Sequence, residues 1–379
     1  MIRRQSTDRP LDAVLCSLLT EQSPPSVVDE HQFDALWTLA EAHSVDLLLA
    51  ASVQRCRDLP SRIREDAAKR LAAAKLLERL RHAELLRVVD RIRTIDVLVL
   101  KGEALAYTVY AEPHLRPRYD VDLFVRHRAV EDVASAVVAL GYTPRRAAAL
   151  AWVQRCYERV DRSGIHYCVD LHWGVANPHP FAHVLPFERA WQMSVPVPRL
   201  GPGVRTLDHS DALLLACVHR VAHHHDSPRL LWLWDIHALA NRMTPSQWER
   251  FWRATSDTGM RAVARRGLQL AHQSFGTLLP ADIDERLLPA DREEPAARFI
   301  GGLRLFDIAV TDMAAMRSWG ERLGFLWKNL FPPLAHMRAT YPRCPALLLP
   351  ATYIARFFRG SRRWLRGQTH AGLSSPAKH

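Results

Sequence analysis

The sequence lacks the long apolar runs of membrane proteins and the cysteine spacing of disulfide-stabilised secreted proteins. No apolar run reaches the roughly 18 residues of a transmembrane helix, and the first four residues lead into no apolar signal segment. Six cysteines occur without C-x-x-C spacing or a regular framework: Cys16, Cys56, Cys156, Cys168, Cys217 and Cys344. We therefore expect free thiols, no transmembrane segment and a cytoplasmic location.

Lysine is also scarce, and arginine takes its place. Of the 51 Lys and Arg residues only five are Lys, and the formal net charge is +11 over 379 residues. Arginine matches phosphate and carboxylate groups, so this excess is compatible with a nucleotide or an RNA as ligand. The arginines are scattered along the whole chain, which favours a solvated basic surface. The charge alone therefore identifies no ligand.

Hydrophobic spacing divides the chain into four parts. Residues 1–94 are predicted to be helical, with helices over 31–56 and 62–93, because apolar residues recur there at helical spacing. Residues 95–200 are predicted as an α+β core, a mixed sheet with helices on one face. A C-terminal helical region is expected over 201–366 and a disordered tail over 367–379.

Three segments of the predicted core have the pattern of strands. Residues 96–100 form a short apolar run, and residues 119–126 alternate polar and apolar side chains. Residues 152–160 and 165–173 flank a turn sequence and are predicted as a hairpin. Helices are expected between these strands, over 103–110 and 128–140.

A D-x-D motif lies on the second predicted strand. Side chains two apart on a strand project from one face, so Asp120 and Asp122 can reach the same ion. Two adjacent carboxylates repel each other unless a cation lies between them. Mg²⁺ is commonly held by a few carboxylates together with substrate phosphates. A lone D-x-D is nevertheless a weak signal, because such pairs also occur on exposed strands.

The turn after the first predicted strand offers a place for phosphate. Lys101 and Gly102 stand where the strand ends and a helix begins. Glycine permits close approach of a phosphate, and a helix N-terminus presents free N–H groups. Lys101 can add a positive charge for the same triphosphate. A plain strand-to-helix turn with a solvent-facing lysine is the alternative.

A third acid, Asp170, lies in the last predicted strand among apolar neighbours. A carboxylate in such a strand is costly without a partner. Alternation places it on one face with His166, Cys168 and His172. Together with Asp120 and Asp122 it would complete a two-metal site, in which one ion activates an attacking hydroxyl and the other holds the triphosphate.

These segments carry a resemblance to a known family. The runs Leu100-Lys-Gly-Glu-Ala-Leu-Ala106, Leu115-Arg-Pro-Arg-Tyr-Asp-Val-Asp-Leu-Phe-Val125 and Val169-Asp-Leu-His-Trp173 resemble the uncharacterised nucleotidyltransferase family of the polymerase-β-like superfamily. The similarity continues through residues 211–239. It implies a nucleotidyltransferase core, an NTP substrate and Mg²⁺ or Mn²⁺ as cofactor.

The resemblance also implies roles for individual residues. Asp120 and Asp122 would bind both ions, and Asp170 would complete the shell of the catalytic ion or take the acceptor's proton. Apart from the resemblance, Arg116 and Arg118 precede the predicted metal strand and are candidates for clamping phosphates, and His172 shares the predicted site face and is a candidate for contacting the acceptor or the base. A structural role is the alternative for each. The superfamily carries a Gly-Ser or Gly-Gly pair at the phosphate turn, where this chain has Lys101-Gly102 followed by Glu103. An acid there either points away from the phosphate or weakens NTP binding.

A histidine cluster follows in the C-terminal region. His219 and His223 stand four residues apart, so on a helix they share a face, as two zinc ligands would. Because no further ligands follow at zinc-site spacing, a polar helix face lining an acceptor cleft is favoured.

The sequence therefore predicts a magnesium-dependent nucleotidyltransferase that moves an NMP from an NTP to an acceptor and releases pyrophosphate. The acceptor stays open between a small molecule, a protein and an RNA, because the helical flanks set acceptor specificity. The alternatives are a non-catalytic nucleotide- or RNA-binding module, a toxin–antitoxin component and a helical interaction protein.

Overall fold

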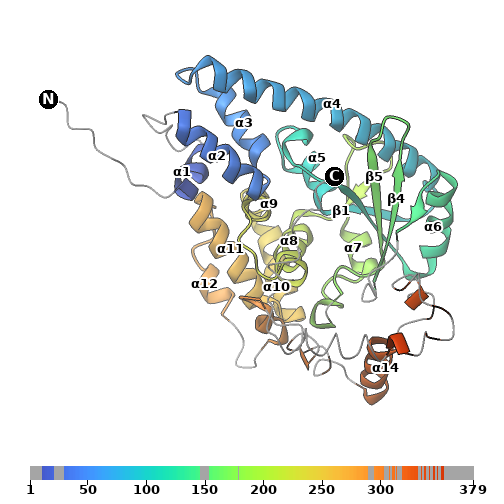
Figure 1. Cartoon of the computed structure of the whole chain (residues 1–379). Coiled ribbons are helices and arrows are strands. Elements are labelled where there is room, and N and C mark those ends of the chain that lie inside the picture. Colours follow the sequence, from blue (N-terminus) through green and yellow to red (C-terminus); the bar gives the residue numbers. More distant parts are fainter. Residues whose placement is uncertain are drawn as a thin grey trace.

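The computed structural model describes residues 11–20, 30–145, 153–177, 179–288, 294–302 and 318–331, together with scattered positions between 307 and 353. The predicted tail at 367–379 lies outside these residues. Over the described ranges, helices from both ends of the chain flank one mixed sheet (Figure 1). The predicted α+β fold with flanking helices is therefore confirmed.

The chain begins with helices that pack against one another: α1 (Leu11–Leu19), α2 (Glu30–His43), α3 (Asp46–Arg55) and the long α4 (Ser61–Arg91). The single helix predicted over 31–56 is wrong, because Ser44 adopts a φ of 55° between α2 and α3. A left-handed residue cannot continue a right-handed helix. The helix predicted over 62–93 is confirmed as α4.

The sheet has seven strands in the order β3-β4-β5-β2-β1-β7-β6. Their bounds are β1 (Val97–Leu100), β2 (Asp120–Val125), β3 (Thr143–Pro144), β4 (Gln154–Val160), β5 (His166–His172), β6 (Val195–Pro196) and β7 (Arg205–Thr206). Two pairs are parallel, β2 with β5 and β1 with β7, and the others are antiparallel. The predicted strands and hairpin are confirmed, and the two-residue strands β3, β6 and β7 are additional.

Short helices connect these strands: α5 (Lys101–Thr108), η1 (Pro113–Leu115), η2 (His127–Ala129), α6 (Val130–Ala139), η3 (His179–Phe181) and α7 (Phe187–Met193). The sheet packs against helices on both faces. On one face Val99, Leu123 and Leu171 belong to an apolar cluster with residues of α4 and α6. On the other face Leu100 and Phe124 join a larger cluster that extends into the C-terminal helices. The expectation of helices on one face only is therefore wrong.

After β7, the described part of the C-terminal region contains the helices α8 (His209–His224), α9 (Leu230–Ala240), α10 (Pro245–Thr258), α11 (Arg261–Phe275), α12 (Ile283–Arg286), η4 (Pro295–Phe299) and α14 (Trp319–Leu330). Local capping sets several of its ends. The Asp208 carboxylate accepts a hydrogen bond from the Asp211 N–H at the start of α8, and Thr244 and Gln247 form a capping box on α10. Gly259, in the left-handed conformation, ends α10.

The two helical regions meet beside the sheet. Helix α1 contacts α11, so the first and last helical regions lie side by side (Figure 1). The larger apolar cluster runs from Leu15 through Leu98 and Phe124 to Phe251 without interruption. Among the described residues, no helix combines the length and apolar character that crossing a membrane requires.

Candidate active site

The pairing of two central strands brings the predicted acids together. Strands β2 and β5 run parallel, and Asp122 is the register partner of Asp170. Asp120 lies opposite Cys168 in the same pairing. Because side chains two apart share a face, all three carboxylates leave the sheet on the same side. Leu123 and Leu171 point to the other side, into the apolar core.

Asp122 lies between two nitrogen donors. Its Oδ1 accepts a hydrogen bond from the Lys101 ammonium at 2.7 Å and lies 2.7 Å from Nε2 of His172. Burial alone would raise the pKa of this carboxyl, but the Lys101 charge and His172 outweigh burial and hold the pKa well below its ordinary value. Asp122 is therefore an anion in a buried position.

Asp120 behaves in the opposite way. Burial first, and then the neighbouring charges of Asp122 and Asp170, raise the pKa of its carboxyl to about 7. Lys101 and Arg116 offset only part of this effect. The site thus concentrates more negative charge than its own residues neutralise, which is the condition that a bound cation relieves.

The ligand atoms available to a metal are close together. One oxygen or nitrogen from each of Asp122, Asp170 and His172 lies within 4.8 Å of the others. Carboxylate oxygens of this kind suit a hard divalent cation such as Mg²⁺. The predicted convergence of Asp122 and Asp170 is thus present in the structure, and Asp120 is close enough for both to shift its pKa.

The turn predicted to hold phosphate is built around Lys101. This residue starts α5 with a φ of 48°, an unusual conformation for a residue with a side chain. Gly102 follows, and a Cβ at this position would overlap the Arg116 guanidinium. The glycine is therefore required by the close approach of Arg116, whatever else it contacts.

Arg116 is engaged by a buried carboxylate from the C-terminal region. Its Nε and Nη2 donate to the two oxygens of Asp235 at 3.0 and 2.7 Å, and the Tyr110 hydroxyl donates to the same carboxylate at 2.7 Å. This buried pair joins the segment before β2 to α9.

Arg118 is engaged in the same manner. Its Nε donates to Glu103 at 2.5 Å and its Nη2 to Glu78 of α4 at 2.6 Å. Glu103 is 2 % exposed, so the acid that departs from the superfamily pattern points into this buried pair. Phosphate binding by Arg116 and Arg118 stays a prediction, and their contacts favour a role in positioning the segment before β2. The sequence carried no signal for these pairings, because the partners stand 15 to 119 residues apart.

The histidines predicted at an acceptor cleft lie at the end of α8. Burial first, and then the Lys101 charge, lower the pKa of His219 and bring that of His223 to about 3, so both rings are neutral at pH 7. The Lys101 charge contributes to the lowered pKa of His223, and the Asp122 carboxylate opposes it. Two buried ring nitrogens, Nδ1 of His172 and Nε2 of His223, have no hydrogen-bond partner among the residues that the structure describes.

A pocket opens next to these groups. Lys101, Arg116, His219 and Asp235 are among its polar lining residues, and Trp232 is among its apolar ones. The Trp232 ring stacks on His224 with centroids 3.7 Å apart.

The comparisons with known proteins agree with this geometry. No curated protein matches the chain. Residues 29–276, about two thirds of its length, match a family described as uncharacterised nucleotidyltransferase. The match covers the sheet, Asp120, Asp122 and Asp170, the Lys101-Gly102 turn and α8. The chain belongs to this uncharacterised nucleotidyltransferase family.

Proposed function

We propose that this protein transfers a nucleoside monophosphate from an NTP to an acceptor, with Asp120, Asp122 and Asp170 holding the magnesium ions that the reaction requires. One observation carries the proposal: Asp122 is the register partner of Asp170 in the parallel pairing of β2 with β5. Asp120 precedes Asp122 by two residues on β2 and therefore shares its face of the sheet. Membership of the family supports a transferase with an NTP substrate. A cytoplasmic location stays a prediction.

The donor set fits a divalent cation. The high pKa of Asp120 arises in part from repulsion by Asp122 and Asp170, and a cation between the carboxylates would remove that repulsion. Bound Mg²⁺ would supply Lewis-acid activation of the acceptor hydroxyl and neutralise charge on the triphosphate. Asp120 and Asp122 would contact both ions, and Asp170 would contact the ion beside the acceptor.

The residues of the chain would then orient the reactants. The acceptor oxygen attacks the α-phosphorus, the bond to the bridging oxygen of the β-phosphate breaks, and pyrophosphate leaves. The acceptor proton passes to the Asp170 carboxylate. With Asp122 holding the ions, the Lys101 ammonium would be released to contact the triphosphate, because it stands on a flexible side chain. His172, His219 and His223 line the side from which the acceptor enters.

The decisive experiment uses water as the acceptor, since the natural acceptor is unidentified. Purified protein is incubated with each α-labelled NTP, with Mg²⁺ or with a chelator, and pyrophosphate and labelled NMP are quantified. Asp120→Ala and Asp122→Asn should remove magnesium-dependent release while leaving the circular dichroism spectrum unchanged. Asp257→Asn, at an exposed position of α10, should match the parent. Equal release by Asp120→Ala and the parent would reject the assignment.

A second candidate is nucleotide or RNA binding without transfer. Glu103 stands where the superfamily carries a small residue at the predicted phosphate turn, and the formal net charge is +11, and a binding module without catalysis would account for both. A binding module would show magnesium-dependent NTP binding by calorimetry with no pyrophosphate release, even when candidate acceptors analysed by mass spectrometry are supplied.

A further inference from the structure

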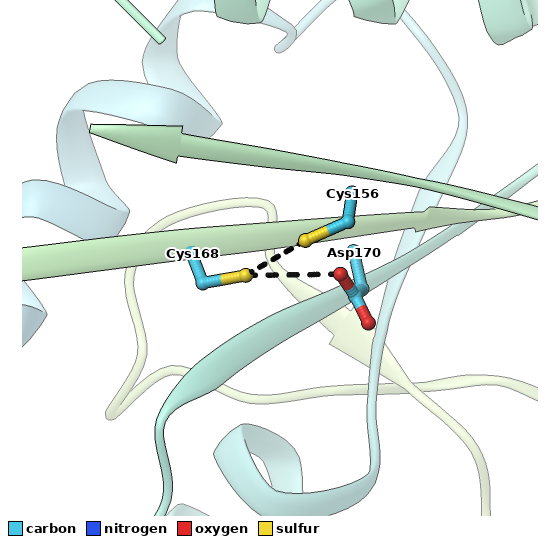
Figure 2. Close-up of side chains that lie close together, drawn as sticks. All are labelled: Cys156, Cys168 and Asp170. Carbon is cyan, nitrogen blue, oxygen red and sulfur yellow. Dashed lines mark hydrogen bonds between the residues drawn. The ribbon is translucent and has the colours of Figure 1, made fainter. Parts of the chain in front are cut away.

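Two cysteines lie against the third acid of the site. Cys156 is on β4 as the register partner of Asp170, and Cys168 precedes Asp170 by two residues on β5. Figure 2 shows the Cys168 sulfur between the Cys156 sulfur and the Asp170 carboxylate. The sulfur atoms are 3.1 Å apart, and the Cys168 sulfur lies 3.7 Å from Oδ1 of Asp170.

The three side chains form a second group of potential metal ligands. Their two sulfur atoms and one oxygen all lie within 4.8 Å of one another. All three side chains are partly exposed, so an ion can reach them from solvent. Neither cysteine has a part in the proposed transfer reaction.

The chemistry of this group differs from that of the magnesium site. Thiolates are soft ligands that select Zn²⁺ and similar ions, whereas Mg²⁺ prefers oxygen. Around a tetrahedral Zn²⁺, with Zn–S near 2.3 Å and Zn–O near 2.1 Å, two sulfurs lie about 3.8 Å apart and a sulfur and an oxygen about 3.6 Å apart. The distance from the Cys168 sulfur to the Asp170 oxygen already matches at 3.7 Å, the sulfur atoms at 3.1 Å would have to separate slightly, and the Cys156 sulfur lies within 4.8 Å of the same carboxylate.

We propose that Cys156, Cys168 and Asp170 form a binding site for Zn²⁺ or a similarly thiophilic divalent ion, and that its occupation prevents nucleotidyl transfer. Binding forms two metal–sulfur bonds and one metal–oxygen bond, and the two thiol protons pass to the buffer. A water molecule fills the fourth position.

The inhibition follows from a shared ligand. Asp170 belongs both to the thiol group and to the group with Asp122 and His172. A carboxylate turned toward a zinc ion between β4 and β5 is withdrawn from an ion beside β2. This second part rests on the proposed function, whereas zinc binding itself does not.

Cobalt provides a test of binding that needs no activity. Co²⁺ titrated into the reduced full-length protein should give thiolate-to-metal charge-transfer absorption and the visible bands of a tetrahedral site, at one ion per chain. Cys156→Ser and Cys168→Ser should each lose the charge-transfer band and weaken binding by more than about 100-fold, since a direct ligand matters more than an outer partner. Cys56→Ser, a partly exposed cysteine remote in sequence, is the matched control and should retain the spectrum. Absence of thiolate absorption in the parent would overturn the proposal.

Inhibition is measured separately. With Mg²⁺ in excess, micromolar Zn²⁺ should abolish pyrophosphate release by the parent and by Cys56→Ser, and a zinc chelator should restore it. The Cys156→Ser and Cys168→Ser variants should remain active in the same zinc concentration. Cobalt binding by a protein that releases no pyrophosphate under any condition would reject the proposed function but retain the site. Release that persists in the zinc-loaded parent would reject the inhibitory coupling.

Discussion

Asp120 is proposed to bind the metal ions, but its ionised carboxylate destabilises the metal-free fold. Its pKa is raised from the ordinary 3.8 to about 7, so the folded protein holds a proton there that the unfolded chain releases. The contribution is absent below about pH 3, where both states are protonated; it destabilises the fold increasingly from about pH 4 to about pH 7 and is constant above that range. At pH 8 without metal it amounts to as much as about 4 kcal/mol. Asp120→Asn should therefore raise the melting temperature at about pH 8 and leave it unchanged at about pH 3, while transfer is lost.

The hairpin turn provides a control with the opposite sign. Backbone N–H groups of Ile165 and Ser163 lower the pKa of Asp161, so its carboxylate stabilises the fold above its unfolded pKa and ceases to do so as pH falls. Asp161→Asn should lower the melting temperature at pH 8. If Asp120→Asn also lowered it in chelator, the described crowding of negative charge would be incorrect.

Lys101 supplies the cation on which buried Asp122 depends in the absence of metal. The substitution Lys101→Met leaves the Asp122 carboxylate with His172 as its remaining partner. In the presence of a chelator it should lower the free energy of unfolding by about 1 to 3 kcal/mol. Added Mg²⁺ no longer competes with the ammonium, so it should raise the melting temperature of this variant more than that of the parent. Lys69→Met, at an exposed position on α4, should show the parent's response to Mg²⁺. Equal responses in all three proteins would place the ion away from Asp122.

At the scale of single residues, the sequence predicted where the aspartates lie better than it predicted which carboxylates pair with the arginines. Asp120, Asp122 and Asp170 follow from strand alternation, a local rule, together with the family resemblance. The partners of Arg116 and Arg118 depend on where α4, α5 and α9 come to lie, and no local pattern encodes that placement. The proximity of Cys156 to Asp170 was not predicted, because it depends on the register between β4 and β5.

Among the elements, α5 depends most on a single small residue. A methyl group at Gly102 would overlap the Arg116 guanidinium and lie 3.3 Å from the Arg118 Cβ. Neither arginine can move freely, since both are fixed by buried carboxylates. Gly102→Ala should therefore cost about 1 to 3 kcal/mol in urea unfolding. Gly324→Ala in α14, where an added Cβ meets nothing within 4 Å, should stabilise by about 0.5 to 1 kcal/mol. Similar effects at both positions would mean that Arg116 does not pack against the turn.

Elements with strong periodicity were predictable, and those held by tertiary contacts were not. Helix α4 agrees with the helix predicted over 62–93 to within two residues at each end, and β1, β2, β4 and β5 lie within the predicted segments. The break at Ser44 was missed because its flanking residues continue the helical pattern. Strands β6 and β7 contain two residues each and exist through pairing with each other and with β1, which a two-residue pattern cannot reveal.

Across the whole molecule, the buried pair of Arg116 with Asp235 connects the predicted core to the C-terminal helices. The predicted boundaries near residues 94 and 200 stay predictions, and the larger apolar cluster crosses both of them.

Truncating one partner of a buried ion pair costs about 3 to 5 kcal/mol, because the other charge remains buried. Asp235→Ala should therefore destabilise the entire chain, and tryptophan fluorescence and far-ultraviolet circular dichroism should report one shared, earlier transition in urea. The exposed control Asp257→Ala should change stability by less than about 0.5 kcal/mol. Two separated transitions in Asp235→Ala, with the strand signal unchanged, would instead show that the helical region unfolds independently and that this pair is a contact between autonomous domains.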